Sequence, residues 1–246
     1  SEETYNLDPQ RLRDVIQNWR REERLKAVMP VHEFGHPSDM AEISAIAAEQ
    51  GLHVVEDAAC ALGASLEGRK AGTFGDLACF SFHPRKTLTT GEGGLVTTDS
   101  PELARRVRRL RNHGMERTAT GVRFMEPSLN YRLTNFQAAL GRTQLPSLDT
   151  WIDKRRDLAS LYRQHLAELA GQRLLTLPNA APGHSWQTFM VVLSDAVDRA
   201  ATIAGLKELG IESNLGAQSM QEIGLYGAAG QTCETCLLYT SDAADE

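Results

Sequence analysis

The chain has 246 residues, of which 41% are hydrophobic and 24% charged, and its formal net charge is −6 with a pI near 5.7. This length is sufficient for a substantial core, whereas the acidic balance provides no basic field for nucleic acid or anionic lipid. No stretch approaches the roughly 18 consecutive apolar residues of a membrane helix, and the first residues lack signal-peptide order. We therefore expect a cytoplasmic protein without nucleic-acid or membrane partners.

The first elements in chain order predict a βαβ unit. Residues 28–32 form a short apolar run, and a helix is predicted over residues 38–50, ended by Gly51. Residues 53–57 then read as a buried strand. One face of the helix is apolar: Met40, Ile43, Ile46 and Ala47. The order strand, helix, strand predicts an α/β fold with a parallel sheet.

Two further strands are predicted over residues 77–82 and 94–98, separated by a loop that contains Lys86. Residues 100–102, Ser-Pro-Glu, are typical of a helix start, and this helix is predicted to end at Asn112. Its arginine-rich run, residues 105–111, could form a phosphate-binding stripe. We favour a solvated helix face, because apolar residues at core spacing interrupt the arginines.

The second half of the chain begins with a capping-box pattern at Thr134 and Gln137. It starts a helical region that is broken at Pro146 and continues to residue 169. A strand over residues 185–193 and a helix over residues 195–209 follow. We predict one large domain within residues 1–150, and a long linking helix with the start of a smaller α/β domain within residues 151–231.

The chain contains four cysteines, too few for a disulfide framework. Cys60 and Cys79 lie in apolar stretches and are predicted to be reduced, buried thiols. Cys233 and Cys236 have zinc-like spacing but lack a second ligand pair, so no metal site is predicted. Residues 232–246 share no periodicity with the preceding chain and read as a non-native tail.

Lys86 is placed between an apolar strand and a glycine-rich turn. A free lysine amine, with a pKa of about 10.4, is protonated and not nucleophilic at neutral pH. Burial or conversion to a Schiff base removes that charge. The position therefore suits a Schiff-base lysine, although spacing alone favours a surface lysine on a hairpin.

Asp57 ends the predicted strand 53–57 at the carboxyl edge of the parallel sheet, where α/β proteins bind ligands. A desolvated carboxylate there requires a cation or several hydrogen-bond donors. A protonated pyridine nitrogen is one such cation. The alternative is an aspartate that caps the turn formed by residues 58–60.

Four stretches occur in a fixed order: VEDAACALGA at residues 55–64, GTFGDLACFSFHPRKTLTTGEGGLV at 72–96, RNHG at 111–114 and LNYRLTNFQAALGRTQL at 129–145. Together they resemble the DegT/DnrJ/EryC1/StrS family of sugar aminotransferases. The resemblance covers about residues 5–227. It implies a fold type I transferase that depends on pyridoxal 5'-phosphate, with a mostly parallel sheet flanked by helices and the cofactor bound by the large domain.

Carried over residue by residue, the resemblance implies that Lys86 binds the cofactor aldehyde and that Asp57 pairs with the pyridinium nitrogen. Ser81 matches a hydroxyl that binds the cofactor phosphate. Asn130 matches an asparagine that reaches this phosphate from the neighbouring subunit, which implies a homodimer with shared sites. Cys60 stands near the cofactor ring where many members carry Gln or His, and a thiol is a weaker donor than an amide.

Two histidines stay outside the predicted catalytic set. His32, in PVHEFG, matches a family motif near the strand ends, and it equally fits a histidine whose hydrogen bonds cap a strand. His83 is close to Lys86 in sequence, but a strand-to-loop position is compatible with a side chain that points away.

The implied activity is transfer of an amino group from an amino acid, glutamate as in the family, to a nucleotide-linked ketosugar. Products of this kind serve deoxyaminosugar, cell-surface polysaccharide or secondary-metabolite biosynthesis. One alternative is a sugar 3-dehydratase of the same fold, in which a histidine replaces the lysine, so Lys86 argues against it. Another is a regulatory protein that binds the cofactor without turnover, against which the intact residue set argues.

A third alternative, a nucleotide phosphate loop at residues 89–94, lacks the Gly-Lys-Ser/Thr ending of such loops. The family's N-terminal phosphate-binding turn and ring-stacking aromatic residue have no match in this chain. The resemblance therefore also implies the middle of a longer enzyme, inactive by itself.

Overall fold

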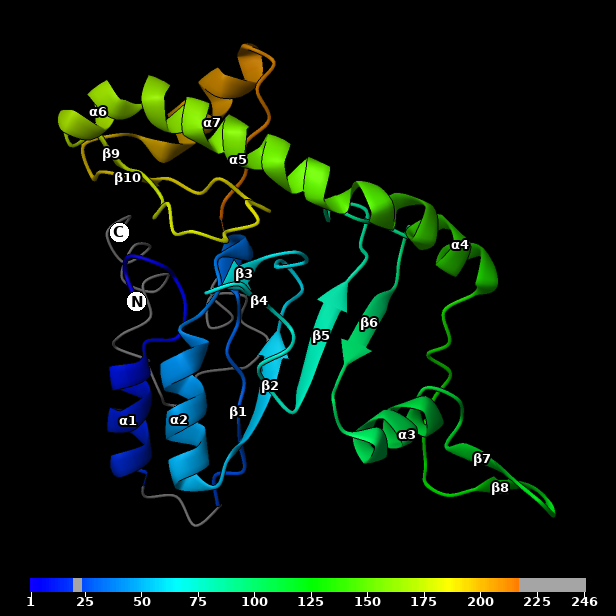
Figure 1. Ribbon diagram of the computed structural model, residues 1–246. Helices are drawn as coiled ribbons and strands as arrows, with labels where there is room; N and C mark the ends of the chain where they lie inside the picture. The colour runs from blue at the N-terminus through cyan, green and yellow to red at the C-terminus, as the bar shows by residue number, and fades with distance from the viewer. Residues whose placement is uncertain (20–23, 217–246) are drawn as a thin grey trace. The chain divides into compact units, whose positions relative to one another are not determined.

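The computed structural model describes residues 1–19 and 24–216 (Figure 1). The predicted tail at residues 232–246, with Cys233 and Cys236, lies outside the described residues. The chain forms two compact units. The first comprises Ser1, Asn6–Ser160 and Ala180–Phe189, and the second comprises Glu2–Tyr5, Leu161–Asn179 and the chain from Met190 onward.

A four-stranded sheet in the order β1-β2-β5-β6 is the centre of the first unit. Its strands are β1 (Ala27–Val28), β2 (His53–Asp57), β5 (Leu77–Ser81) and β6 (Gly94–Thr97). β1, β2 and β5 pair in parallel, whereas β6 is antiparallel to β5. The predicted α/β fold with a mostly parallel sheet is therefore confirmed.

Helices α1 (Pro9–Gln17) and α2 (Met40–Gln50) lie side by side in Figure 1. The predicted apolar face of α2 is buried, and Gly51 ends the helix in the left-handed conformation at φ 63°. α1 was not predicted, although Asp8 and Pro9 provide an N-cap and a first-turn proline. The core between these helices and the sheet contains Leu12, Val28, Met40, Ile43, Ile46, Ala47 and Val54.

The remaining elements of the first unit are short hairpins and helices. They are η1 (Glu33–Gly35), the hairpins β3 (Ser65–Leu66) with β4 (Arg69–Lys70) and β7 (Met115–Thr118) with β8 (Gly121–Phe124), α3 (Pro101–Leu110), α4 (Asn135–Gln144) and η2 (Leu145–Ser147). The capping box of Thr134 and Gln137 begins α4 as predicted. In α3, Arg105, Arg106 and Arg108 are exposed, which agrees with a solvated face.

Helix α5 (Leu148–His165) continues from η2 and is followed by α6 (Ala167–Gly171). In the second unit, β9 (Leu175–Thr176) pairs with β10 (Val192–Leu193) in antiparallel orientation, and α7 (Arg199–Glu208) follows. None of the helices in the described part of the chain is both long and apolar enough to cross a bilayer.

Three predictions of local structure were wrong. The strand predicted over residues 185–193 is reduced to β10, because Trp186 is left-handed at φ 52° and Ser185 N donates to Gly35 O in a loop contact. The last helix begins four residues later than predicted, because the Asp198 side chain caps it by accepting from Ala201 N. Cys79 is exposed, since β5 alternates and its neighbours Ala78 and Phe80 take the buried face.

The loop at residues 184–186 contains a neutral histidine that makes folding sensitive to acid. Burial and the nearby His36 lower the pKa of His184 to about 3, although a hydrogen bond from the ring to the backbone of Gly35 opposes this shift. The His184 ring stacks on Trp186 with centroids 4.0 Å apart, and its Nδ1 accepts from Trp186 N at 2.9 Å.

We expect the free energy of unfolding to fall by about 1.4 kcal/mol per pH unit from about pH 6.5 towards pH 3, because only the unfolded chain binds the His184 proton there. His184→Asn, which cannot titrate, should remove this slope in urea unfolding experiments. His165→Asn, at an exposed position in α5, serves as the control and should retain it. An unchanged slope in His184→Asn would contradict the assignment.

Candidate cofactor site

The carboxyl ends of β2 and β5 bring two of the predicted site residues to one edge of the sheet. Asp57 is the last residue of β2 and pairs with Cys79 in the parallel register. Cys79 stands two residues before Ser81, the last residue of β5. Burial raises the pKa of Cys79, and the negative charge of Asp57 raises it further. This edge is where parallel α/β sheets bind their ligands.

Lys86 lies in the turn that follows β5 and is half-buried. Its Nζ donates to Cys60 Sγ at 3.0 Å, and its backbone N donates to His83 O at 2.9 Å. Cys60 belongs to the turn after β2. The side chains of Cys60 and Lys86 therefore join the turn that follows β2 to the turn that follows β5. The lysine is on a β5–β6 connection, yet its amine is directed at a thiol.

Asp57 is held by backbone contacts on both sides. Its N donates to Pro30 O at 2.9 Å, and its O accepts from His32 N at 3.0 Å. Its Oδ1 accepts from Ala59 N at 3.0 Å, so the turn-capping contact considered from the sequence is present. Pairing with a cation is a separate role and stays a prediction.

The other two predicted residues lie at different places. Ser81 Oγ accepts from His83 N at 3.3 Å at the end of β5. Asn130 forms a bridge with Asn112, is exposed, and accepts from Arg132 N at 3.3 Å through its Oδ1. Asn130 thus contacts residues 112 and 132, whereas Asp57, Cys60, Ser81 and Lys86 gather at the strand ends.

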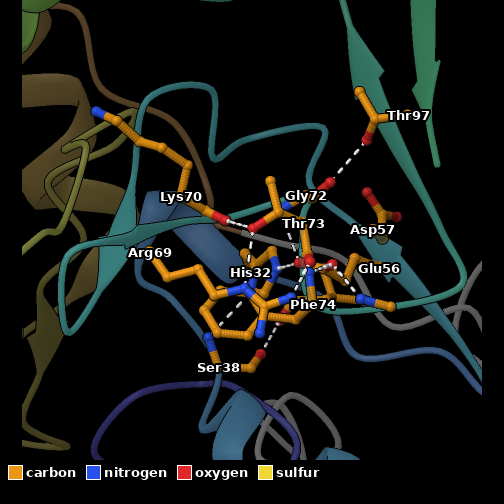
Figure 2. Close-up of polar contacts among 12 residues, drawn as sticks. His32, Ser38, Glu56, Asp57, Arg69, Lys70, Gly72, Thr73, Phe74 and Thr97 are labelled. Carbon is orange, nitrogen blue, oxygen red and sulfur yellow. Dashed lines mark hydrogen bonds and ion pairs between the residues drawn. The ribbon is translucent and has the colours of Figure 1, made fainter. Parts of the chain in front are cut away.

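Directly beneath this edge, Glu56 is a fully buried carboxylate (Figure 2). His32, also fully buried, contacts Glu56 Oε2 through Nε2 at 2.9 Å. Because His32 Nδ1 accepts from Ser38 N at 3.0 Å, the proton is on Nε2, which donates to Glu56. Of the two readings for His32, the histidine with satisfied hydrogen bonds is the one observed.

Three backbone amides of one loop also donate to Glu56. Gly72 N reaches Oε2 at 2.7 Å, and Phe74 N and Gly75 N reach Oε1 at 2.6 and 2.7 Å. Burial alone would raise the pKa of Glu56, but the hydrogen bonds from His32 and these amides outweigh it and lower the pKa. Figure 2 shows Asp57 next to Glu56 but outside the hydrogen bonds drawn there.

Glu33 is a further acid close to the strand ends. Burial raises the pKa of Glu33, and the negative charge of Asp57 raises it further. A hydrogen bond with the backbone of Phe34 and the positive charge of Lys86 both oppose this rise. Glu33 begins η1, and its backbone N donates to Asn6 Oδ1 at 2.8 Å. The charges of Asp57 and Lys86 thus act on the Glu33 carboxyl in opposite directions.

The loop that contains Lys86 is held by two glutamines. Gln187 Oε1 accepts from Thr87 N and Thr87 Oγ1 at 3.1 and 3.0 Å, while its Nε2 donates to Arg85 O at 2.9 Å. Gln144 Oε1 accepts from Thr89 N at 3.2 Å, and its Nε2 donates to Thr89 O at 2.7 Å. Gln187 therefore contacts both neighbours of Lys86 in the chain.

Gln187 is in turn fixed by Arg155 of α5, whose Nη1 donates to Trp186 O and Gln187 O at 3.0 and 3.3 Å. His83 belongs to the Lys86 loop, and its Nε2 atom lies 3.9 Å from Glu92 Oε1. Sequence reasoning missed Gln187, Gln144 and the role of Glu56. A signal for Glu56 was present, namely an acid at an inward position of a buried strand.

The sequence matches the DegT/DnrJ/EryC1/StrS aminotransferase family over residues 1–245. The chain belongs to this family. It is 40% identical over 216 residues to the GDP-perosamine synthase of Caulobacter vibrioides, with 85% of the chain and 56% of that protein covered. It is 42% identical over 190 residues to the UDP-N-acetyl-3-dehydro-alpha-D-glucosamine 3-aminotransferase of Acidithiobacillus ferrooxidans, covering 74% of the chain and 49% of that protein.

Solved structures of the DegT/DnrJ/EryC1/StrS fold agree with the architecture. S. venezuelae DesV in complex with a ketimine intermediate superposes with a TM-score of 0.83 at 35% identity, covering 100% of the chain and 63% of that protein. The GDP-4-keto-6-deoxy-D-mannose-3-dehydratase of E. coli with bound hydrated PLP superposes with a TM-score of 0.76 at 26% identity, covering 86% and 57%. The chain thus spans about half to two thirds of the length of these proteins.

The residues at the strand ends fit pyridoxal phosphate by their chemistry. The site provides an amine for an aldehyde, a carboxylate for a ring nitrogen and a hydroxyl for a phosphate, in Lys86, Asp57 and Ser81. The observation behind this fit is that the Lys86 amine is half-buried and directed inward at Cys60. In the described ranges, no group of three or more His, Cys, Asp or Glu side chains could hold a metal ion.

Glu56→Gln should destabilise the chain by about 3–5 kcal/mol, because a buried charge-assisted network loses its charge and an amide N–H then faces donors. The wild-type contribution should be full above about pH 4.5 and decline as the pH falls through the lowered pKa of Glu56. Glu49→Gln is the control, since Glu49 pairs with Arg13 at the exposed surface and should cost less than about 1 kcal/mol. Urea unfolding at several pH values measures both, and equal costs would contradict the network's role.

Gln187→Ala should reduce the hydrogen-exchange protection of the Thr87 amide about tenfold, because one net hydrogen bond contributes roughly 0.5–1.5 kcal/mol. Gln144→Ala is the matched control: it should affect the Thr89 amide and leave Thr87 protected. Gln187→Glu retains the acceptor but not the donor, so Thr87 should stay protected in it. Loss of Thr87 protection in Gln144→Ala would show that the loop opens as a whole.

Proposed function

We propose that the protein of which this chain forms part is a pyridoxal-phosphate-dependent aminotransferase. It moves an amino group from an amino acid, glutamate by preference, to a nucleotide-linked ketosugar. The observation that carries the proposal is the half-buried Lys86 amine beside Cys60 at the sheet edge that Asp57 and Ser81 share. We assign this cofactor site to a large domain within residues 1–150, with residues 151–231 beginning the small domain.

When bound, pyridoxal phosphate supplies an electron sink that stabilises negative charge at the amino acid α-carbon. Lys86 would hold the cofactor through Nζ and, as a free amine, would take and return a proton through the same atom. Asp57 would keep a proton on the ring nitrogen through its carboxylate. Ser81 Oγ would donate to the phosphate, and Cys60 would offer the ring a weak donor in place of an amide or imidazole.

The names of the relatives support a nucleotide-sugar substrate, since one is a GDP-perosamine synthase and another a UDP-sugar 3-aminotransferase. A dehydratase is also among the structural neighbours. Lys86 favours amino transfer, because the dehydratases that this family includes carry a histidine in place of that lysine. We place the reaction in the cytoplasm, where cysteines such as Cys60, which is free here, remain reduced.

An exposed apolar surface supports a homodimer with shared active sites. Large hydrophobic side chains near Asn130 in the sequence are between 53% and 81% exposed: Val122, Phe124, Met125, Leu129, Tyr131 and Phe136. Apolar surface of this extent is typical of protein–protein contacts. We propose that a second subunit covers it, and that Asn130 then reaches the cofactor phosphate of that subunit.

Incubation with pyridoxal phosphate followed by borohydride should attach the cofactor to Lys86, because only a lysine that has reacted with the aldehyde is reduced. Mass mapping of peptides identifies the labelled residue. In the full-length enzyme, Lys86→Arg should abolish this label and the formation of 2-oxoglutarate from glutamate. Lys154→Arg, at an exposed position of α5, should change neither. Labelling of surface lysines with Lys86 left unmodified would overturn the assignment.

A further inference from the structure

Cys60 and Lys86 form a nucleophilic pair, and a bond between their side chains is not a step of the amino transfer proposed above. The Nζ–Sγ distance is 3.0 Å, and both side chains are half-buried. We propose that this pair is a redox-dependent modification site, in which a hydroperoxide oxidises Cys60 and the sulfur then bonds covalently to Lys86 Nζ. The link rests on this geometry alone, whereas its effect on cofactor binding rests on the proposed function.

Both backbones are fixed, so the two atoms stay close. Cys60 O accepts from Ser185 Oγ at 3.4 Å, and the turn around it is closed by Ala61 N donating to Ala58 O at 2.9 Å. Lys86 N donates to His83 O, and Gln187 holds the residues before and after the lysine. The flexible four-carbon stem of Lys86 can provide the remaining approach needed for a bond.

The chemistry balances in two steps. In the first, the sulfur attacks the peroxide oxygen: Cys60–SH and ROOH give Cys60–SOH and ROH, so the sulfur is oxidised and the peroxide reduced. In the second, the Lys86 nitrogen displaces the hydroxyl group: Cys60–SOH and the Lys86 ammonium give an S–N bond, one water and one proton. The precedent is the condensation of a sulfenic acid with a backbone nitrogen to give a sulfenamide.

Cys79 is the competing thiol and is less suited to this reaction. Cys79 is exposed on β5, but the part of its side chain that is shielded from water and the negative charge of Asp57 raise its pKa, which disfavours the reactive thiolate. Within residues 1–19 and 24–216, no amine forms a hydrogen bond with the Cys79 sulfur. Cys60 therefore differs from Cys79 in having the Lys86 amine beside its sulfur, and not in being more accessible to solvent.

The S–N bond would reversibly block the Lys86 amine, which is the group proposed to bind the cofactor. Two equivalents of a small thiol would restore it: the S–N bond is reduced to the Cys60 thiol and the Lys86 amine, and the two small thiols form one disulfide. In the oxidised chain the amine is not free to react with an aldehyde, so peroxide would prevent loading of the cofactor until a reductant returns.

The test uses the chain with Cys79→Ser, Cys233→Ser and Cys236→Ser, in which no intramolecular disulfide can form. After treatment with one equivalent of hydrogen peroxide, its intact mass should fall by two hydrogen atoms. Peptide mapping should show the peptides of Cys60 and Lys86 joined, and dithiothreitol should separate them. The same mapping on the wild-type chain covers the case in which the variant does not fold.

Adding Lys86→Arg should leave only products that have gained oxygen. A loss of two hydrogen atoms that persists in Lys86→Arg would overturn the proposal, because the sulfur would then have reacted with another nitrogen. Gain of oxygen alone in the chain that retains Lys86 would overturn it as well.

Cofactor labelling separates this proposal from the proposed function. Labelling of Lys86 by pyridoxal phosphate and borohydride should decrease in proportion to the cross-linked fraction and return after dithiothreitol. If the link forms but the reduced chain is never labelled at Lys86, the redox site stands and the assigned cofactor lysine is wrong.

Discussion

The buried carboxylate of Glu56 is the constraint on which the candidate site depends. A charge without solvent must be compensated by donors, and Glu56 obtains these from His32 and from three amides of the loop at residues 72–75. That loop can approach only because Gly72 adopts φ +85°, where a Cβ atom would lie 2.3 Å from the ring of Phe80 in β5. The carboxylate therefore fixes β1, β2 and β5 to one another. Because side chains alternate along a strand, the same arrangement directs Asp57 away from the core at the strand end.

The uncharged side-chain amides of two glutamines hold the loop that carries Lys86, and their neutrality matters for the electrostatics of the lysine. A glutamine can accept and donate at the same time without adding charge, and Gln144 and Gln187 do both. A charged side chain in either place would act on the Lys86 amine directly. Gln187 comes from the segment at residues 184–188, which Arg155 and Gly35 also bind. Closing a loop of about 100 residues costs only slightly more entropy than closing a short one, so such a distant residue can serve this purpose.

Local patterns were sufficient to predict the βαβ unit, the apolar face of α2 and the capping box of α4, since these depend on neighbours in the sequence. The position of Asp57 at a strand end follows from the same reasoning, whereas Ser81 lay inside the predicted strand 77–82 and was singled out only by the family resemblance. The contacts of Gln187 and the strand predicted over residues 185–193 could not be inferred, because distant partners decide both. Apolar composition there suggested a strand, but the left-handed Trp186 and its stacking on His184 exclude one. For Cys79, an apolar run concealed the alternation that exposes it.

Cys60 connects these constraints to the reactivity of the site. A glutamine or histidine in its place would donate a stronger hydrogen bond, whereas a thiol accepts the Lys86 amine and adds a group that can be oxidised. Gln187 holds the residues on both sides of Lys86, and the loop directs the Lys86 amine inward. The group that the amine contacts therefore depends on the side chain at position 60. Where that residue is an amide, the contact can only be a hydrogen bond. Where it is a thiol, the same geometry also permits the covalent bond proposed above, and the rigidity that would prepare Lys86 for a cofactor aldehyde would prepare it equally for an oxidised sulfur.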